Sequence, residues 1–408
     1  MYLKRILAEH FLRCSATFPV VLVTGARQVG KTTLIRALIE REGINRRYVS
    51  LDDFGPRTLA GEDPELFLQR YPAPLAIDEV QHVPALLDRL KARVDQLGQN
   101  GSYWLTGSQA FSLMSGVSES LAGRVAIVRL AGLSLSELRG KTFGRLPFRP
   151  DRLDSNSADS EFGLLEIFEQ IVRGSFPRLA LPDAPSSETY LDSYVQTYVE
   201  RDIRSLMNIA NLAAFQRFLR LIAARTAQLL NYSDLARDAG IALNTAKEWV
   251  ALLEATHQVL ILRPFYENLS KRQTKTPKLY VVDTGLACHL SGWHSAEAAS
   301  SGAMAGALFE TLVVTELWKS YVHRGRPAPL WFFRNRDKEE VDVIIQDEGL
   351  LFPIEVKLTA SPNRRDLKGQ IALEKTGAKI ASGVVICLTK QRYPISPTVE
   401  ALPVSAID

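Results

Sequence analysis

Residues 25–32 read GARQVGKT, and this stretch decides the fold of the N-terminal part of the chain. It satisfies the pattern GxxxxGK[ST], directly after the apolar run 19–23 and before a helical pattern that contains Leu34 and Leu38. In that setting the glycines let backbone N–H groups point at phosphate oxygens, and the helix N-terminus adds partial positive charge. The stretch therefore predicts a loop that binds the phosphates of a nucleotide.

The loop residues have separate expected roles. We expect Lys31 to reach the β- and γ-phosphate oxygens and Thr32 to place its hydroxyl on Mg²⁺. The other predicted cofactor-binding residues are Gly25, Ala26, Arg27, Gln28, Val29, Gly30 and Thr33. A glycine-rich turn without a ligand is the alternative, and the strand and helix around the loop argue against it. ATP and Mg²⁺ are the predicted cofactors.

Short apolar runs recur along the first third of the chain, separated by segments long enough for helices. The runs are residues 19–23, 47–51, 75–77, 103–105 and 125–130. This alternation predicts an α/β fold in which helices cover a parallel sheet.

Two acids follow the third of these runs, at Asp78 and Glu79. An acid at the carboxyl end of a buried parallel strand lies in the crevice where open α/β sheets bind ligands. We expect Asp78 to hold the magnesium shell and Glu79 to orient and deprotonate a water. A solvated acidic turn is the alternative, which the nearby phosphate loop disfavours.

Three further residues are candidates for contact with the γ-phosphate. Thr106 or Ser108 would emerge from the fourth strand beside it, although a simple turn explains both. Arg124 precedes the fifth strand and is the leading candidate for an arginine that reaches into a neighbouring subunit's site. A surface arginine is the competing interpretation of Arg124.

The rest of the chain divides by pattern. A polar linker at 152–160 and helical periodicity predict a helical lid over residues 136–226, after a nucleotide-binding core over 1–135. Helices at 232–239 and 244–254, a turn at Gly240 and a β-rich stretch at 259–282 predict a winged helix over 227–294. A mixed α/β domain is expected over 295–408.

Three acids and a lysine in this last part fall in an order that suits a nuclease metal site: Glu310, Asp342, Glu355 and Lys357. Glu355 and Lys357 are two apart in a predicted strand and therefore share a face. Carboxylates can hold Mg²⁺ against a scissile phosphate while the lysine stabilises charge. The pattern looks like PD-(D/E)xK, with Val341 where a proline often stands; an exposed strand of alternating charged and apolar residues is the alternative.

Several stretches together resemble a large family of bacterial and archaeal AAA-type ATPases with a C-terminal, restriction-endonuclease-like domain of uncharacterised function. They are GARQVGKTTL, LAIDEVQHVPALLDRLK, YWLTGSQAFSL, SESLAGR, GSFPRL, YVERDI, PKLYVVDTGLA and EVDVII followed by PIEVK. The resemblance implies an AAA+ parallel sheet, ATPase activity and a homo-oligomeric ring such as a hexamer. It implies no particular substrate.

Composition and charge bound the remaining options. With 408 residues, 46% of them hydrophobic and 23% charged, the chain should fold as several domains. Its net charge of +4 is too small for a general polyanion binder. The cysteines Cys14, Cys288 and Cys387 form no CxxC pair, which fits a reducing compartment. Because no leader or membrane-spanning stretch is evident, a cytoplasmic protein without a membrane partner is expected.

Basic residues gather in the predicted wing, so phosphate contact with DNA is one expectation. They are Arg263, Lys271, Arg272, Lys275 and Lys278. Packing between the lid and the C-terminal domain explains them equally well. Two functions thus compete: a DNA-processing ATPase with a nuclease-like domain, and a nucleotide-driven switch or protein remodeller whose C-terminal domain is a non-catalytic docking module. A small-molecule kinase is disfavoured by Asp78 and Glu79.

Overall fold

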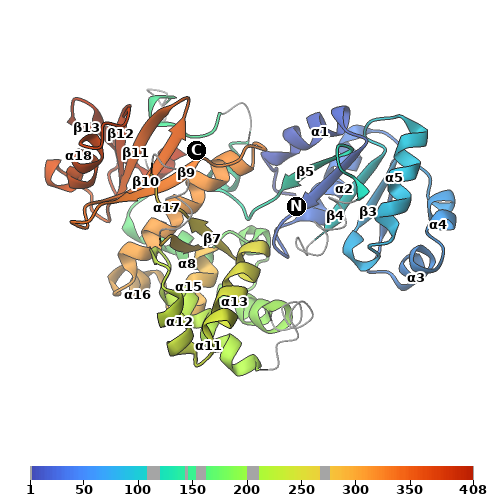
Figure 1. Ribbon diagram of the computed structural model, residues 1–408, viewed down its shortest axis with the longest axis horizontal. Coiled ribbons are helices and arrows are strands. Elements are labelled where there is room, and N and C mark those ends of the chain that lie inside the picture. The colour runs from blue at the N-terminus through green and yellow to red at the C-terminus, as the bar shows by residue number, and fades with distance from the viewer. Residues whose placement is uncertain are drawn as a thin grey trace.

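The computed structural model describes residues 2–107, 120–142, 146–152, 162–199, 211–266 and 276–407. Within these ranges the strands form a five-stranded, a three-stranded and a six-stranded sheet. The five-stranded and six-stranded sheets lie at opposite ends of the molecule, as Figure 1 shows. Ser108, Lys271, Arg272 and Lys275 lie outside the described residues.

The N-terminal sheet is parallel throughout, in the order β2-β3-β4-β1-β5. Its strands are β1 (Val20–Thr24), β2 (Arg47–Ser50), β3 (Leu75–Asp78), β4 (Tyr103–Gly107) and β5 (Val125–Arg129). Each strand coincides with one of the predicted apolar runs to within two residues at either end. The predicted α/β fold with a parallel sheet is confirmed.

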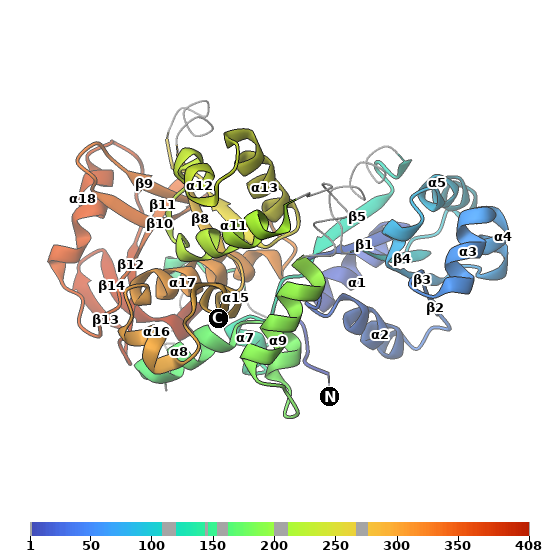
Figure 2. The ribbon, with the colours of Figure 1, turned by 90° about the horizontal axis from the view of Figure 1, so that it is seen from below.

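Helices cover both faces of this sheet (Figure 2), so β1, which lies next to the middle strand β4, is buried on both sides. Val20 and Leu22 of β1 pack into one hydrophobic cluster, and Val21 and Val23 pack into another. The first cluster includes side chains of α3 (Phe54–Glu62), α4 (Pro64–Arg70) and α5 (Leu86–Leu97). The second includes side chains of α1 (Leu7–Thr17) and α2 (Lys31–Glu42).

The middle of the chain is mainly helical. Its helices are α7 (Leu135–Leu138), α8 (Leu164–Arg173), α9 (Ser187–Tyr194), α11 (Leu212–Ala224), α12 (Tyr232–Ala239), α13 (Leu243–Ala255), α15 (Thr284–Ser291) and α16 (Ala296–Ser301). The short 3-10 helix η3 (Pro177–Ala180) lies between α8 and α9. A small antiparallel sheet in the order β6-β8-β7 completes the region, from β6 (Gln228–Leu229), β7 (Val259–Leu262) and β8 (Lys278–Val281).

Helices α12 and α13 and the antiparallel pair β7-β8 follow one another in the predicted order, and the winged helix itself stays a prediction. Gly240 ends α12 in the left-handed conformation, with φ 71°. Helix α11, which lies in the predicted lid, packs against α12. The lid and the two helices are therefore in direct contact.

The C-terminal region is a mixed sheet with a long helix on it. The sheet has the order β13-β14-β12-β11-β10-β9. Its strands are β9 (Leu330–Arg334), β10 (Glu340–Asp347), β11 (Leu350–Val356), β12 (Gly383–Cys387), β13 (Tyr393–Ser396) and β14 (Val399–Pro403). Helix α17 (Ala305–Val322) is buried along most of its length, and α18 (Lys368–Glu374) packs on β10.

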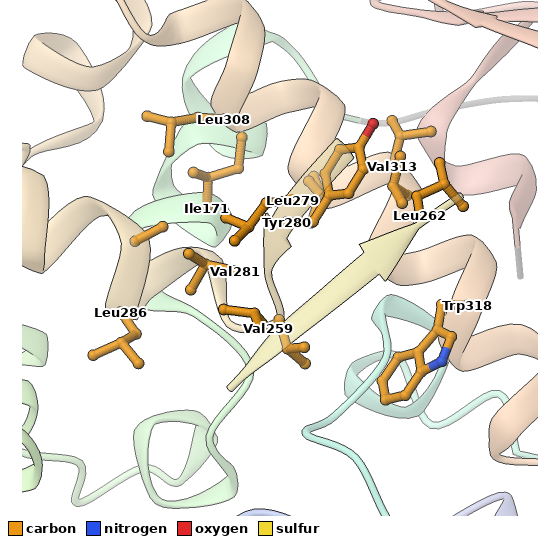
Figure 3. Packing of buried hydrophobic residues seen from close by; sticks show 14 of the residues in the cluster. Ile171, Val259, Leu262, Leu279, Tyr280, Val281, Leu286, Leu308, Val313 and Trp318 are labelled. Carbon is orange, nitrogen blue, oxygen red and sulfur yellow. The ribbon is translucent and has the colours of Figure 1, made fainter. Parts of the chain in front are cut away.

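One hydrophobic core joins the middle and C-terminal regions. Figure 3 shows Val259 and Leu279 of the small sheet beside Leu308 and Val313 of α17. This core continues across residue 295, where the predicted winged helix was expected to give way to the last domain, since Ala287 and Ala296 belong to the same cluster. Among the helices of the described residues, none combines the length and apolar character needed to span a bilayer.

Candidate nucleotide-binding site

The loop between β1 and α2 has the conformation that a phosphate-binding loop requires. Gly25 has φ 148°, and a Cβ there would lie 2.1 Å from the carbonyl oxygen of Leu130, so only glycine fits. Gly30 has φ 94° and precedes the first turn of α2. The glycines thus turn the backbone from the sheet into the N-terminus of a helix.

Lys31 is almost fully buried within this loop. Its Nζ donates hydrogen bonds to the carbonyl oxygens of Gly25, at 3.1 Å, and Ala26, at 2.9 Å. The ammonium therefore lies inside the ring of loop backbone, where it can meet a phosphate oxygen without a large movement.

Thr32 and Asp78 meet as predicted, at the carboxyl edge of the sheet. The Thr32 hydroxyl donates to the two carboxylate oxygens of Asp78 at 2.8 and 3.1 Å. The Thr106 hydroxyl donates to Asp78 and accepts a hydrogen bond from the backbone N–H of Glu79 at 3.0 Å. Thr106 thus ties the two acids of the third strand together.

Tyr48 is a residue of this network that sequence reasoning missed. It lies on β2, which pairs with β3, and its hydroxyl donates to Asp78 at 2.7 Å. Burial, and then the hydrogen bond to Asp78, raise the pKa of Tyr48 to about 12, so the phenol stays a donor at neutral pH. Its contact with Asp78 depends on the order of the strands in the sheet, which local patterns do not encode.

Glu79 has a positive φ of 56°, which is rare for a residue with a side chain. The Gln81 side-chain amide donates to its carboxylate. This turn directs Glu79 to a cavity of about 450 Å³ that it shares with Lys31 and Thr32. A cavity of this size suits a nucleotide-sized ligand.

The cavity is bounded on one side by the phosphate loop and on the other by distant segments. The predicted residues that line it are Arg27, Gln28, Gly30, Lys31, Thr32, Thr33 and Glu79. The far wall includes Tyr2, Leu3, Leu133, Pro177, Arg178 and Leu181. Ala26 and Val29 direct their side chains into the core, so they can offer only backbone to a ligand.

Arg5 also supports the loop, and sequence reasoning missed it. Its guanidinium donates to the carbonyl oxygens of Val29, at 2.8 Å, and Ala131, at 2.7 Å, and it pairs with Glu137 at 3.1 Å. Burial alone would raise the pKa of Glu137, but the adjacent Arg5 brings it below the ordinary value.

Arg124 lies at the opposite end of the sheet from its own phosphate loop. It precedes Val125, which is level with Val20 at the start of β1, whereas the loop follows the end of β1. Its guanidinium contacts Asp95 at 2.6 and 2.9 Å on the surface, and this hydrogen-bonded partner raises the pKa of Arg124. The side chain therefore lies far from the phosphate loop of its own chain.

The four residues of the predicted nuclease pattern come together in the C-terminal region. Lys357 Nζ lies 3.3 Å from Asp342 and 3.1 Å from Glu355. Glu310 lies within the same group, because Lys278 contacts both Glu310, at 2.9 Å, and Asp342, at 3.8 Å. Burial and then the Asp342 charge raise the pKa of both Glu310 and Glu355.

Lys278, Glu340 and Tyr280 are members of this acid cluster that sequence reasoning did not place there. Lys278 contacts Glu340 at 2.5 Å, and the Tyr280 hydroxyl donates to Glu310 at 2.7 Å. The expected phosphate contact of Lys278 from the wing is wrong, since only 3% of the residue is exposed. It binds carboxylates across the junction of the two regions, as the packing alternative expected.

The predicted metal ligands of this cluster are neutralised by two lysines. Among the residues that the structure describes, no group of three or more His, Cys, Asp and Glu side chains is arranged to hold a metal ion. Arg263, the other described basic residue of the wing, is half-buried. Glu310, Asp342 and Glu355 thus meet, as the pattern predicts, but around ammonium groups.

Comparison with known proteins separates the chain into three stretches. A family described as an AAA domain matches residues 17–139. Two families described as domains of unknown function match residues 165–297 (DUF8612) and 305–407 (DUF4143). Two curated relatives, both named as uncharacterised proteins of Mycobacterium tuberculosis and Mycobacterium bovis, are 29% identical over 405 residues, covering 99% of this chain and 84% of each relative.

Solved structures resemble the chain weakly. A Walker-type ATPase of Pyrococcus abyssi is 14% identical with a TM-score of 0.38, covering 70% of this chain and 94% of that one. The RuvB Holliday junction branch migration motor of Thermotoga maritima is 19% identical with a TM-score of 0.30, covering 62% and 85%. Likenesses at this level leave the function open. The AAA-domain match and the loop geometry together support an AAA-type P-loop ATPase.

Proposed function

We propose that this protein is a Mg²⁺-dependent AAA+ ATPase that converts ATP to ADP and phosphate. The observation that carries the proposal is the hydrogen-bonded group of Thr32, Asp78 and Thr106, which lies beside Lys31 and Glu79 at one edge of the parallel sheet. Hydrolysis needs a phosphate loop, a pair of oxygen donors for a cation and a carboxylate that can act on water.

Each residue of the site has a separate role in the proposed hydrolysis. Lys31 and the loop N–H groups offset the negative charge of the β- and γ-phosphates. Glu79 orients the attacking water and takes its proton, while Thr106 keeps Asp78 and Glu79 in register. The Thr32 hydroxyl and the Asp78 carboxylate are oxygen donors of the kind that Mg²⁺ prefers, and bound Mg²⁺ would neutralise charge on the phosphates.

The activity that hydrolysis drives has two candidates. DNA processing by a nuclease-like C-terminal domain would require a cation among Glu310, Asp342 and Glu355. The two lysines within contact distance of these acids favour the second candidate, a nucleotide-driven switch or remodeller whose C-terminal domain is a docking module. In that case the acid cluster holds the middle and C-terminal regions together.

Phosphate release from ATP by the purified full-length chain tests the ATPase proposal. Wild type should hydrolyse ATP only with Mg²⁺, and Lys31→Ala should weaken ATP binding by about 100-fold because the phosphate charge is left uncompensated. Equal ATP affinity in the two proteins would contradict the assigned site. Lys338→Ala, which removes an exposed lysine, is the control.

The two candidate roles differ in their response to DNA. A DNA-processing enzyme should cleave duplex or single-stranded DNA in Mg²⁺ or Mn²⁺, and DNA should raise its ATP turnover. A switch should do neither. Cleavage that is lost in Asp342→Asn would restore the nuclease candidate.

A further inference from the structure

Two of the stretches that carry the family resemblance, GSFPRL and PKLYVVDTGLA, contribute none of the residues that act on phosphate, magnesium or water in the proposed reaction. They are far apart in the sequence, and the structure brings them together at Ser175 and Asp283. One carboxylate oxygen of Asp283 accepts from both the backbone N–H and the hydroxyl of Ser175, each at 2.7 Å. Both residues are buried.

The approach of the two stretches is close enough to depend on glycine. A Cβ at Gly174 would lie 2.5 Å from Asp283 Oδ1, and one at Gly285 would lie 2.9 Å from the Cα of Gly174. Both are below the closest distance at which real side-chain carbons are found. Gly174 therefore allows the carboxylate to reach the backbone of the next residue.

Ser175 is also hydrogen-bonded on its other side to the segment that follows β5. Its carbonyl oxygen accepts from the Leu133 N–H at 2.7 Å. A Cβ at Gly132 would lie 2.1 Å from the Ser175 hydroxyl oxygen, so the two segments touch. Hydrogen bonds to a buried carboxylate and to a neighbouring backbone together leave Ser175 little freedom.

The residues that follow Ser175 form the far wall of the nucleotide cavity. Pro177, Arg178 and Leu181 line it, and Pro177 begins η3. Pro177 also lies across from the phosphate loop, since its Cγ is 3.7 Å from where a Cβ on Gly30 would be. The position of Ser175 thus sets the distance between this wall and the loop.

We propose that Asp283 is a positioning residue for nucleotide binding, which acts through Ser175 to fix the turn at residues 174–181 against the phosphate loop. The proposal rests on the proposed ATPase function, because it assigns the cavity to a nucleotide. Asp283 follows β8, whose first residue is Lys278 of the acid cluster. The same short segment therefore contacts both the nucleotide wall and the C-terminal region.

Asp283 also caps a helix, and the experiment must separate this role from its contact with Ser175. Its other oxygen accepts from the Leu286 N–H at 2.8 Å and caps α15. Asp63 caps α4 in the same way, at 2.9 Å from the Leu66 N–H, and it does not line the cavity. Asp63→Asn therefore makes the same chemical change at a cap without the bond to Ser175.

The test measures the Kd for ATP of the full-length chain by titration calorimetry, and its KM and kcat from phosphate release. The melting temperature without nucleotide shows whether each variant is folded. In Asp283→Asn the Kd and KM for ATP should rise by about tenfold, while kcat changes by less than about threefold, because the wall is displaced and Glu79 is not. Ser175→Ala removes one of the two bonds and should raise Kd by about threefold. Asp63→Asn should leave Kd unchanged.

Wild-type affinity in folded Asp283→Asn and Ser175→Ala would overturn the proposal, and so would an equal loss of affinity in Asp63→Asn. Should Asp283→Asn be too unstable to purify, Ser175→Ala, which keeps the cap of α15, decides alone. If wild type itself fails to bind ATP, the ATPase proposal falls and this inference falls with it. A failure of positioning alone leaves wild-type binding intact.

Discussion

At the scale of single residues, the nucleotide site depends on Thr106, because it contacts both acids of the third strand. Its hydroxyl donates to Asp78 and accepts from the Glu79 N–H. The two hydrogen bonds together fix the orientation of this hydroxyl. Glu79 is in turn kept in a positive-φ conformation that costs about 1 kcal/mol or more. Strain of this kind is typical of residues that act on a substrate.

Glu79→Gln tests the role of that strained acid. The amide cannot take a proton from water, so we expect kcat for ATP hydrolysis to fall by about 100-fold or more, while the Kd for ATP stays within about threefold. Rapid-quench and binding measurements on the same preparation separate the two quantities. Retained turnover would remove Glu79 as the base.

At the scale of elements, the strand β8 joins the small sheet to the acid cluster. Lys278, at its start, contacts Glu310, Glu340 and Asp342, and it is almost completely buried. Carboxylates in such a place are stable as anions only while a cation remains among them. Burial alone would lower the pKa of Lys278, but the charges of Glu310, Asp342 and Glu340 together raise it, so Lys278 stays charged.

Lys278→Met should therefore destabilise the protein, by about 3–5 kcal/mol, because the buried acids lose a positive partner. Urea unfolding monitored by tryptophan fluorescence measures the change, with Lys338→Met as an exposed control. A variant as stable as wild type would show that Lys357 alone can balance the acids. Mg²⁺-dependent stabilisation of Lys278→Met would mean that a cation enters in its place.

A buried histidine, His323, forms the C-cap of α17 and makes the packing of this helix end sensitive to acid. Burial lowers the pKa of His323 to about 3, although Glu137 opposes this and Arg5, Lys319 and Arg324 reinforce it. The unfolded chain binds a proton at His323 below about pH 6.5 and the folded chain does not. The neutral ring thus contributes stability above that pH, and the contribution is lost as pH falls toward 3.

His323→Gln removes this titration and should flatten the pH dependence of stability. Relative to wild type, the variant should lose about 1.4 kcal/mol less free energy of unfolding between pH 7.5 and pH 5.5. Denaturation curves at the two pH values provide the comparison, and the difference between the proteins cancels the contribution of other groups. Parallel pH profiles would show that His323 does not titrate in this range.

At the scale of the whole molecule, the position of Arg124 predicts an assembly. It lies at the far end of the sheet from its own phosphate loop, so an arginine finger at this place must act on a neighbouring copy. Heterologous contacts of this kind form a closed ring when the rotation between subunits closes, and an open filament when it does not. The salt bridge with Asp95 would hold the side chain at the surface until a neighbour docks.

Mixing two inactive variants tests this assembly. Arg124→Ala and Lys31→Ala should each hydrolyse ATP poorly, and an equal mixture should recover activity at roughly a quarter of the sites, where an intact loop meets an intact arginine. Arg93→Ala, which removes another arginine paired with an acid, should be active alone. Absence of recovery, with mixed assembly shown by cross-linking, would confine Arg124 to a surface role.

Local sequence patterns were enough to predict the nucleotide domain. The loop 25–32 and the acids after β3 are contiguous stretches whose chemistry depends on neighbours in the chain. A parallel α/β sheet then brings the carboxyl ends of its strands to one edge. Thr32, Asp78 and Thr106 meet for this reason. Their contact could therefore be predicted without knowing how the loops or the rest of the chain fold.

Contacts between distant segments could not be predicted in the same way. The order of C-terminal acids indicated that Glu310, Asp342 and Glu355 would meet, but Lys278 reaches them from another sheet. Its basic neighbours suggested a surface wing, whereas tertiary packing buries it. A buried carboxylate can be balanced by any cation that the fold brings close to it. The sequence pattern around the carboxylate does not show which segment supplies that cation.

The sequence by itself determined a phosphate-binding loop, two adjacent acids after a buried run and the parallel strands that carry them, because each depends on residues that are neighbours in the chain. Only the tertiary structure decided that Tyr48 and Arg5 support that site, that Asp283 holds its far wall, and that lysines occupy the acid cluster. These contacts join segments far apart in sequence, and packing of a shared core sets their distances.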